Sequence, residues 1–514
     1  MTFPSKPRLL FLPPLFLALS LLGVYLGTIA PGLTWANGGS DGGDLITAAA
    51  TGGIPHPTGY PLYLLLARIF QLLPAGSLAF RTNLMSTLAT VLAAVLIYWI
   101  VTRSLMTSGT VPSWLTGMAA GYAFGLAPLI WSQAVITEVY ALQALLVVLI
   151  LYLYIQPVQV SSGSQKRLDR WRGLSLGLAM GNHMTTLLIL PAAFLVGSLQ
   201  RWVDPDMVSQ HRRGWFGNWR LDGYSFRRQF SWFGLGLLIY LILPLRAFAH
   251  PPVTWGDPVT LGRFWWLASG QLYQSYYLQT SLPEIGEHLQ SGAALLILQF
   301  GTPGLVLGLM GLFMSGVPTR LYIFTSWIAV VSLVFGLFYS SVDFYIYLIP
   351  MFISFAIWIG LGSAGLIRQV PQRFSILGLG LGLLLIGYFT VRSATQVSHV
   401  DASHDLRAES FGREVLVAAP KDAIIFAKGD QAVFALWYFH FALKERPDLI
   451  VIAEDLLHFD WYQETLQKTY PSLVVPGPFP WPETMARTNP LHSVCYVRYS
   501  NLTELQCSVP LSPP

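Results

Sequence analysis

The sequence has little charge and almost no cysteine. Only 11% of its 514 residues are Asp, Glu, Lys or Arg, whereas soluble domains carry about 25%. This shortage excludes an ordinary soluble globular protein. The two cysteines, Cys495 and Cys507, are too few for a disulfide scaffold, and a single bridge between them requires that this end of the chain face an oxidising compartment.

Charge is missing altogether from several long stretches. Nothing ionises between Arg8 and Asp41, between Arg81 and Arg103, or between Arg103 and Glu138. Each stretch exceeds the roughly 20 apolar residues that a helix needs to cross ~30 Å of hydrocarbon. The sequence therefore predicts a polytopic α-helical membrane protein.

The expected number of transmembrane helices is about eleven. The first apolar stretch is longer than the ~7–15 residues of a signal-peptide core, so we interpret it as a retained helix. Residues 173–200 are interpreted as two short helices broken at Gly181–Asn182–His183, because the charged flanks require an even number of crossings there. The predicted spans are 9–30, 83–102, 114–132, 138–155, 173–187, 188–200, 230–246, 292–316, 321–340, 345–366 and 375–391.

Basic residues set the expected orientation. With a cytoplasmic N-terminus, the cytoplasmic segments hold 16 Lys and Arg and the external loops before residue 392 hold four, in keeping with the positive-inside rule. Because these residues lie between spans, the net charge of +5 does not indicate nucleic-acid binding. Isolated Asp and Glu residues cluster on the external side. Membrane topology does not require this clustering, so it suggests a chemically active site on that side. The compact loops favour a bacterial inner membrane.

The chain changes character after residue 391. Residues 1–391 form the predicted transmembrane catalytic domain, and residues 392–514, with charges every few positions, form a small extracytoplasmic domain. A strand-like "DAIIFAKGD", a helical "QAVFALWYFHFALKE" and a second strand-like "PDLIVIAED" follow one another there. This alternation predicts an α/β domain.

The segment 40–63, "SDGGDLITAAATGGIPHPTGYPLY", is the most distinctive external stretch. Asp41 and Asp44 share a face if the chain is helical there, and they are either catalytic carboxylates or a helix cap with a residue favoured by the helix dipole. Pro55, Pro57 and Pro61 predict that residues 54–61 form a stiff segment, called the strut below. On it, His56 and Tyr60 are candidate substrate-binding residues, and His56 binds phosphate, orients a carboxylate or merely packs.

Three further candidates stand near external span ends. Glu138 is either a functional membrane-edge acid or a simple helix-start carboxylate. Asp343 either contributes to a site or pairs with an arginine of the 246–263 loop. His183 is expected to be a hydrogen-bonded packing residue, with contact to a substrate phosphate as the alternative.

The loop 244–277 combines arginines with many aromatic residues. Arginine forks suit phosphate and flat rings suit sugars, so the loop is interpreted as ligand-binding. An interfacial aromatic belt with snorkelling arginines is the alternative. The candidate substrate-binding residues in this loop are Arg246, Trp255, Asp257 and Arg263.

No metal-ligand motif stands out in the external loops, which contain no HxxxH, CxxC or DxD pair. No cofactor and no metal site are therefore predicted. A divalent cation such as Mg²⁺ or Mn²⁺, held by one or two carboxylates together with a substrate phosphate, is compatible with the sequence but not required by it.

Several of these stretches resemble one family of membrane glycosyltransferases. The segment from "SDGGDLITAAATGGIPHPTGYPLY" through "RTNLMS" is similar to the amino-terminal hallmark of a family formerly labelled a domain of unknown function. That family includes the animal O-mannosyltransferase of plexin-type receptors and belongs to the GT-C superfamily, which uses polyprenyl-phosphate sugars. "TEVYALQ", "GLSLGLAMGNHMTTLLILP", "PLRAFAHPPVTWGDP", "DFYIYLIP" and the C-terminal "AIIFAKGDQAVFALWYFHFALKERPDLIVI" are similar as well.

The resemblance implies a GT-C fold and a catalytic acid in the first external loop, which lies between the predicted spans 9–30 and 83–102. Asp41 matches the aspartate of the family's D-x-G-E pattern, and Asp44 stands where glutamate is usual, which leaves open which of the two is the base. The implied reaction inverts a sugar from a polyprenyl-phosphate donor onto a hydroxyl of a protein, lipid or glycan, with Arg246 and Arg263 on the phosphate and Trp255 facing the sugar.

Two other classes of function compete with this interpretation. A transporter or flippase for lipid-linked sugars would use external acids for ion coupling, but such proteins commonly show internal repeats and paired mid-membrane charges, which the sequence lacks. A structural assembly factor would tolerate replacement of both first-loop aspartates.

Overall fold

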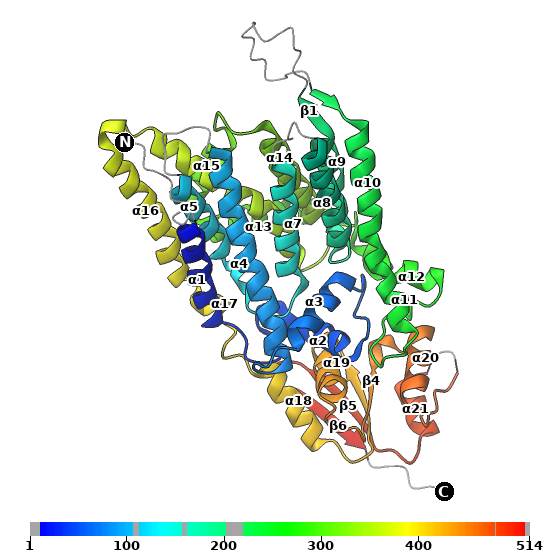
Figure 1. Cartoon of the computed structure of the whole chain (residues 1–514). Coiled ribbons are helices and arrows are strands. Elements are labelled where there is room, and N and C mark those ends of the chain that lie inside the picture. Colours follow the sequence, from blue (N-terminus) through cyan, green and yellow to red (C-terminus); the bar gives the residue numbers. More distant parts are fainter. Residues whose placement is uncertain (1–10, 106–112, 157–161, 202–218, 478–479, 509–514) are drawn as a thin grey trace.

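The computed structural model describes residues 11–105, 113–156, 162–201, 219–477 and 480–508. Long helices run side by side through most of the molecule, and a small sheet lies at one end of them (Figure 1). The helices up to residue 400 are α1 (Leu12–Leu26), α2 (Gly42–Thr51), α3 (Pro61–Gln71), α4 (Leu78–Leu105), α5 (Ser113–Gly125), α6 (Pro128–Ala134), α7 (Val139–Ile155), α8 (Ser162–Met180), α9 (Leu190–Ser198), α10 (Gly223–Leu237), α11 (Ile242–Ala247), α12 (Leu261–Ala268), α13 (Leu282–Leu312), α14 (Thr319–Leu337), α15 (Ile349–Arg368), α16 (Ser375–Ala394) and α17 (Val397–Val400).

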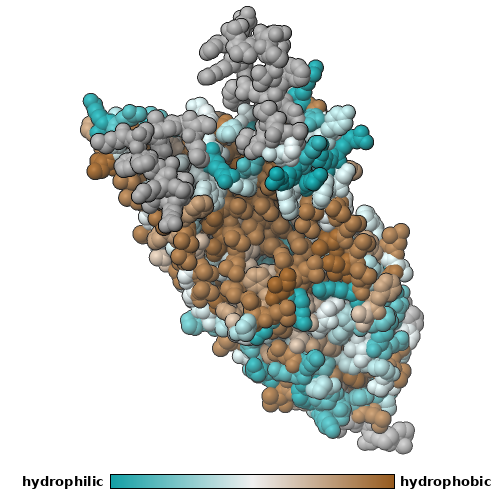
Figure 2. All heavy atoms as spheres, viewed as in Figure 1, coloured by the Kyte–Doolittle hydropathy of each residue, from teal (hydrophilic) through white to brown (hydrophobic). Residues whose placement is uncertain are grey.

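The surface of these helices carries a broad hydrophobic belt, bounded at both ends by hydrophilic residues (Figure 2). Exposed apolar side chains such as Val330 and Val334 on α14 and Leu383 and Leu384 on α16 belong to helices long enough to span a bilayer. Exposed apolar surface of this extent is stable only against lipid. The chain is therefore an integral, multi-pass membrane protein.

Each predicted span contains a helix, but the predicted number of eleven crossings is not confirmed. Among the described residues, six helices are long and apolar enough to cross a membrane, or seven if a bent pair counts as one span. The other predicted spans do not meet these requirements. Helices α1, α5 and α9 are too short, with 15, 13 and 9 residues, and charged residues occupy the first half of α8. The start of the first predicted span and the basic segment 202–218 lie outside the described residues.

Two predicted spans are interrupted in the structure. The stretch 114–132 ends one helix at Gly125 and starts another at Pro128, because proline cannot continue a helix but suits its first turn. The pair α6 and α7 is bent by 114°, which places Glu138 at the break. In the stretch 173–200 the break predicted at Gly181–Asn182–His183 is confirmed, because α8 stops at Met180 and a 3₁₀ helix, η4 (Met184–Ile189), begins after His183.

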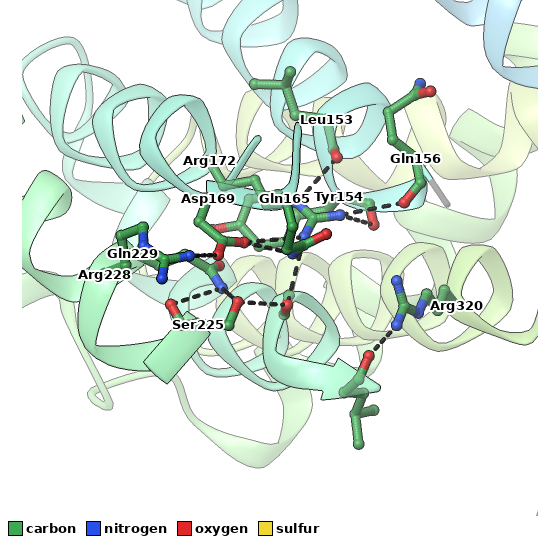
Figure 3. Close-up of polar contacts among 12 residues, drawn as sticks. Leu153, Tyr154, Gln156, Gln165, Asp169, Arg172, Ser225, Arg228, Gln229 and Arg320 are labelled. Carbon is green, nitrogen blue, oxygen red and sulfur yellow. Dashed lines mark hydrogen bonds and ion pairs between the residues drawn. The ribbon is translucent and has the colours of Figure 1, made fainter. Parts of the chain in front are cut away.

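Polar side chains of α7, α8 and α10 are buried together within the helical part of the molecule (Figure 3). Asp169 and Arg172 on α8 are both fully buried and 3.6 Å apart. Arg228 of α10 binds the other oxygen of Asp169 at 2.7 Å. Arg172 also donates to the carbonyls of Leu153 and Tyr154 at the end of α7. This cluster joins α7, α8 and α10 at the basic end of the bundle.

A four-stranded sheet occupies the opposite end (Figure 1). Its order is β4-β3-β5-β6, with β3 parallel to both neighbours and β6 antiparallel to β5. Cys495 and Cys507, directly opposite on β5 and β6, form a disulfide. The elements of this part are α18 (Arg407–Ala418), β3 (Ile424–Lys428), α19 (Asp430–Trp437), β4 (Ile450–Ala453), α20 (Asp460–Thr469), α21 (Pro482–Thr488), β5 (Val494–Tyr499) and β6 (Thr503–Ser508); a separate pair, β1 (Leu199–Arg201) and β2 (Trp219–Leu221), lies at the other end.

Helices α2 and α19 meet where the sheet joins the helical part. Gly43 allows the close approach, because a Cβ atom on this residue would lie 2.3 Å from the carbonyl oxygen of Phe434. Burial of Phe434 and Trp437 fixes α19 against the first loop. The C-terminal segment is thus part of the wall around the first-loop aspartates.

Candidate active site

Asp41 lies at the amino end of α2 with its carboxylate turned away from the helix backbone. It occupies the N-cap position but makes no capping hydrogen bond. Its side chain is 35% exposed, and the hydroxyl of Ser40 donates to Oδ1 at 3.4 Å. The helix-cap interpretation of Asp41 therefore does not describe its side chain, which is available to a ligand.

Asp44 is buried one turn further along α2 and is already occupied. Its Oδ2 accepts the backbone N–H of His56 and contacts the ring Nδ1, both at 2.8 Å. Its side chain is 0% exposed. Asp44 and Asp41 therefore differ in their access to a ligand. Asp44 is buried and binds the strut, whereas Asp41 is partly exposed.

His56 connects the two carboxylates. Its Nδ1 contacts Asp44, while Nε2 lies 3.5 Å from Asp41 and 3.1 Å from the hydroxyl of Tyr60. The strut that carries this histidine is pinned at Ile54, which pairs with Thr254 in a short β-bridge. The proline-rich segment thus holds the imidazole at a fixed point between the aspartates.

The environment of His56 favours its protonated form. Burial lowers the pKa of the imidazole, but Asp41, Asp44 and Glu138 together outweigh burial and raise the pKa to about 9 from 6.5. A group whose pKa is raised by folding stabilises the protein fully below its unfolded pKa, and this contribution is lost as the pH rises through the folded pKa. The imidazolium is therefore part of the folded site at neutral pH.

Replacing His56 by glutamine is expected to remove a pH-dependent part of the stability. The thermal midpoint of the unaltered protein should fall as the pH rises through about 9, and the variant should start lower and lack that fall. Thermal unfolding in detergent between about pH 6 and about pH 10 tests this expectation. The exposed His458→Gln is the matched control, and a variant that keeps the alkaline fall would show that another group causes it.

A large cavity opens beside Asp41. Its volume is about 880 Å³, and residues of the first loop, η4, the 269–278 segment, the 339–347 segment and the C-terminal part line it. Six predicted site residues are brought together in its wall. They are Asp41, His56, Tyr60, Glu138, His183 and Asp343.

The four candidates from the 244–277 loop lie behind this wall. Arg246 donates to the carbonyls of Ala48 and Gly53, at the carboxyl end of α2. Trp255 packs its ring against His56 and does not line the cavity. These residues support the strut and the end of α2.

Asp257 and Arg263 connect the loop to the C-terminal segment. Arg263 makes a two-pronged ion pair with Glu464 of α20, with N–O distances of 2.7 and 2.9 Å. It also lies 3.3 Å from Asp257. Because carboxylates occupy this guanidinium, the structure offers no geometric support for Arg263 on a substrate phosphate.

Sequence reasoning missed Asp430 and several tyrosines of the wall. Asp430 follows β3 and starts α19, and burial together with nearby Asp41 raises its pKa to about 6. The signal that could have found Asp430 is its position just after a predicted strand, because open α/β sheets bind ligands at the carboxyl ends of their strands. The tyrosines come from segments far apart in the sequence, and they are Tyr140, Tyr273, Tyr276, Tyr277, Tyr339, Tyr345 and Tyr347.

The wall is rich in acids and hydroxyls. Among the described residues that line the cavity, none is lysine or arginine, while Asp41, Glu138, Asp343 and Asp430 supply carboxyl groups. The described part of the chain also contains no group of three or more His, Cys, Asp and Glu side chains placed to hold a metal ion. Any anionic ligand here depends on His56, on hydroxyl donors or on a cation that it brings with it.

An apolar cavity adjoins the polar one. It has a volume of about 290 Å³, and four residues, Leu188, Tyr277, Leu278 and Phe335, line both. Its other lining residues are Val331, Val334 and Phe338 at the end of α14. Since α14 is one of the helices able to span a membrane, the site has a side arm toward the lipid.

Comparison with known families finds two matching domains. A family model described as the protein O-mannosyl-transferase TMEM260 N-terminal domain matches residues 41–205. A second, the TMEM260-associated domain 2, matches residues 408–506. The first match begins at Asp41, and the second covers the sheet and α19.

Two curated relatives have similar sequences over most of this chain. The mouse protein O-mannosyl-transferase TMEM260 is 26% identical over an alignment of 464 residues, which covers 85% of this chain and 62% of the relative. The protein O-mannosyl-transferase tmem260 of Dictyostelium discoideum is 22% identical over an alignment of 509 residues, which covers 85% of this chain and 57% of the relative. The chain thus spans about three fifths of the length of these relatives.

Solved structures of ArnT from Cupriavidus metallidurans share the fold. The form bound to undecaprenyl phosphate superposes with a TM-score of 0.59 and covers 96% of this chain and 94% of its own, at 13% identity. The apo form gives a TM-score of 0.57 at the same identity. The GT-C fold expected from the sequence is therefore present.

Proposed function

Because the chain belongs to the family that the two TMEM260 domain models describe and has the GT-C fold, we propose that it is a membrane glycosyltransferase. It transfers mannose from a polyprenyl-phosphate donor to a hydroxyl group of a protein acceptor. The sugar and the acceptor are taken from the names of the relatives, which are protein O-mannosyl-transferases.

The observation that carries this proposal is the position of Asp41. Its carboxylate is the accessible one of the first-loop pair, and it lies in the wall of a cavity large enough for a sugar and its phosphate. A general base must reach the proton that it removes. Asp44 is buried and bound to the strut, so Asp41 is the base in this proposal and Asp44 is a positioning residue.

The proposed reaction is a single displacement with inversion. Asp41 accepts the proton of the acceptor hydroxyl as its oxygen forms a bond to the anomeric carbon. The bond between that carbon and the phosphate oxygen breaks, and polyprenyl phosphate leaves with the electron pair. Phosphate is a good leaving group, so no protein acid is needed on the departing oxygen. The imidazole of His56, whose Nε2 lies 3.5 Å from Oδ2 of Asp41, holds this carboxylate in position.

The two cavities support a lipid-linked donor. Tyrosine rings and hydroxyls of the polar cavity suit a sugar and its phosphate, and the apolar side arm beside α14 suits the first isoprene units. Undecaprenyl phosphate, which one of the ArnT structures holds, belongs to the same chemical class. A divalent cation bound together with the phosphate would offset the acids of the wall, and the proposal includes it as a variable to test.

We place the site on the extracytoplasmic side of a bacterial inner membrane. The sheet and α2, which follows Asp41, lie at one end of the molecule, and β1 lies at the other end (Figure 1). The buried Arg172 contacts Gly197 just ahead of β1, and the positive-inside rule puts this basic end in the cytoplasm. The Cys495–Cys507 disulfide is in keeping with an oxidising compartment.

The proposed function predicts release of free lipid phosphate. Purified protein given a short-chain polyprenyl-phosphate mannose and a pool of Ser/Thr-containing peptides should form mannosylated peptide and polyprenyl phosphate in equal amounts. Parallel reactions with Mg²⁺, with Mn²⁺ and with a chelator test the need for a cation. Movement of the intact donor across vesicles, with no release of polyprenyl phosphate, would instead indicate a flippase and would rule out the transferase.

A further inference from the structure

A second, smaller cavity lies on the far side of the first loop from the membrane helices. Its volume is about 260 Å³. Six of its lining residues do not line the large cavity, and they are Trp35, Lys428, Gly429, Gln431, Ala432 and Tyr499. Nothing in the proposed reaction or in the relatives assigns a role to this space.

The sheet builds one side of the second cavity. Lys428 ends β3 and Tyr499 ends β5, and both strands are parallel, so their carboxyl ends meet at one edge. Gly429, with a positive φ of 81°, turns the chain from β3 into α19 and donates its N–H to Asp455. The chain leaves β3 toward β4 and returns to β5 on its other side, and such switch points are where open α/β sheets bind ligands.

The first loop builds the other side, and it is held in place. The ring of Trp35 lies 4.3 Å from that of Tyr499, centroid to centroid, and is itself buried. Asp405 accepts the backbone N–H of Trp35 at 2.9 Å and the hydroxyl of Thr34 at 2.6 Å. The cavity is therefore a formed space between two anchored elements.

The two cavities share one wall, and that wall carries the proposed base. Gly38, Ser40 and Asp430 line both spaces. Ser40 precedes Asp41 and donates to its carboxylate. A group that reaches past these three residues from the smaller cavity arrives at Asp41, and the smaller cavity shares no lining residue with the apolar side arm that suits the donor lipid.

We propose that the smaller cavity is the acceptor subsite and that it takes an extended, water-borne polypeptide carrying a serine or threonine. This inference rests on the proposed transferase function and adds the route by which the protein acceptor reaches Asp41. The amide of Gln431 and the carboxylate of Asp430 line the cavity and can pair with a peptide backbone, whereas the ammonium of Lys428 is paired with Glu454 at 3.1 Å. A lipid acceptor would need an aliphatic wall, and Ala432 is the aliphatic side chain among the described lining residues.

Blocking the smaller cavity chemically tests the inference without disturbing the core. Both native cysteines are in the disulfide, so Gln431→Cys introduces a single thiol for a polyethylene-glycol maleimide. Lys421→Cys, exposed just ahead of the amino end of β3, is the matched control at the opposite end of that strand. The probes are the short-chain polyprenyl-phosphate mannose and the pool of Ser/Thr-containing peptides.

The labelled Gln431→Cys protein should transfer mannose to peptide at least ~10-fold more slowly than the labelled control. Its slow release of polyprenyl phosphate without peptide should be unchanged, because water still reaches Asp41. Full peptide transfer by the blocked protein would overturn the acceptor subsite, as would an equal fall in donor hydrolysis. A lack of any polyprenyl phosphate release by the unlabelled protein would instead overturn the proposed function itself.

Discussion

Replacing Asp41 by asparagine is expected to lower kcat for mannose transfer by ~10²–10⁴-fold, the usual contribution of a general base. The amide keeps the size of the side chain and cannot accept the proton of the acceptor hydroxyl. Asp41 is partly exposed and makes no capping bond to α2, so the variant should fold normally. The measurement is the initial rate of mannosyl-peptide formation at saturating donor.

Two comparisons make this result specific to Asp41. Glu287→Gln removes an exposed carboxylate from the start of α13 and should leave kcat unchanged. Asp44→Asn should act through His56, lowering activity together with thermal stability, because it weakens a buried pair. If Asp41→Asn retains full transfer while Asp44→Asn abolishes it without loss of stability, Asp44 is the base.

Replacing Arg172 by methionine is expected to cost ~3–5 kcal/mol of unfolding free energy, because it removes one of the two arginines paired with the buried carboxylate of Asp169 and leaves buried carbonyl groups without their donor. Asp169 and Arg172 are both 0% exposed, and the guanidinium also satisfies carbonyl groups at the end of α7 (Figure 3). Methionine fills similar space but donates nothing. Denaturant titration in detergent micelles measures the loss.

The matched control for Arg172 lies on the same helix. Arg167→Met removes an exposed arginine of α8 and should change stability by less than ~0.5 kcal/mol. The double variant Asp169→Leu with Arg172→Met should lose less than the sum of the single changes, since a buried ion pair can be replaced by apolar residues at little cost. Additive losses would mean that the two side chains do not stabilise each other.

The residues of the first loop show how far sequence reasoning reached. The prolines and the aspartates predicted a stiff segment with accessible acids, and the structure places Asp41 and His56 together on the cavity wall. The sequence could not decide whether Asp41 or Asp44 is the base. The answer depends on which carboxylate the strut covers, and the strut is positioned by Thr254, about two hundred residues away.

Arg246 and Arg263 show where composition was misleading. An arginine in an aromatic-rich external loop suits phosphate, but the fold gives these two side chains nearer partners in the end of α2 and in Glu464. Asp430 is the converse case, since a residue assigned to a separate part of the chain completes the wall. Contacts between distant segments decided all three positions.

By itself the sequence determined that the chain is a multi-pass membrane protein with an acidic, proline-rich first loop, and its resemblance to a known family implied the GT-C fold. Hydrocarbon admits long runs without charge, and proline limits the backbone locally, so both features are legible residue by residue. Tertiary structure alone decided which carboxylate faces the cavity, which arginines are already paired and that the C-terminal sheet borders the site. Those outcomes depend on burial and on partners far away in the chain, which no local pattern records.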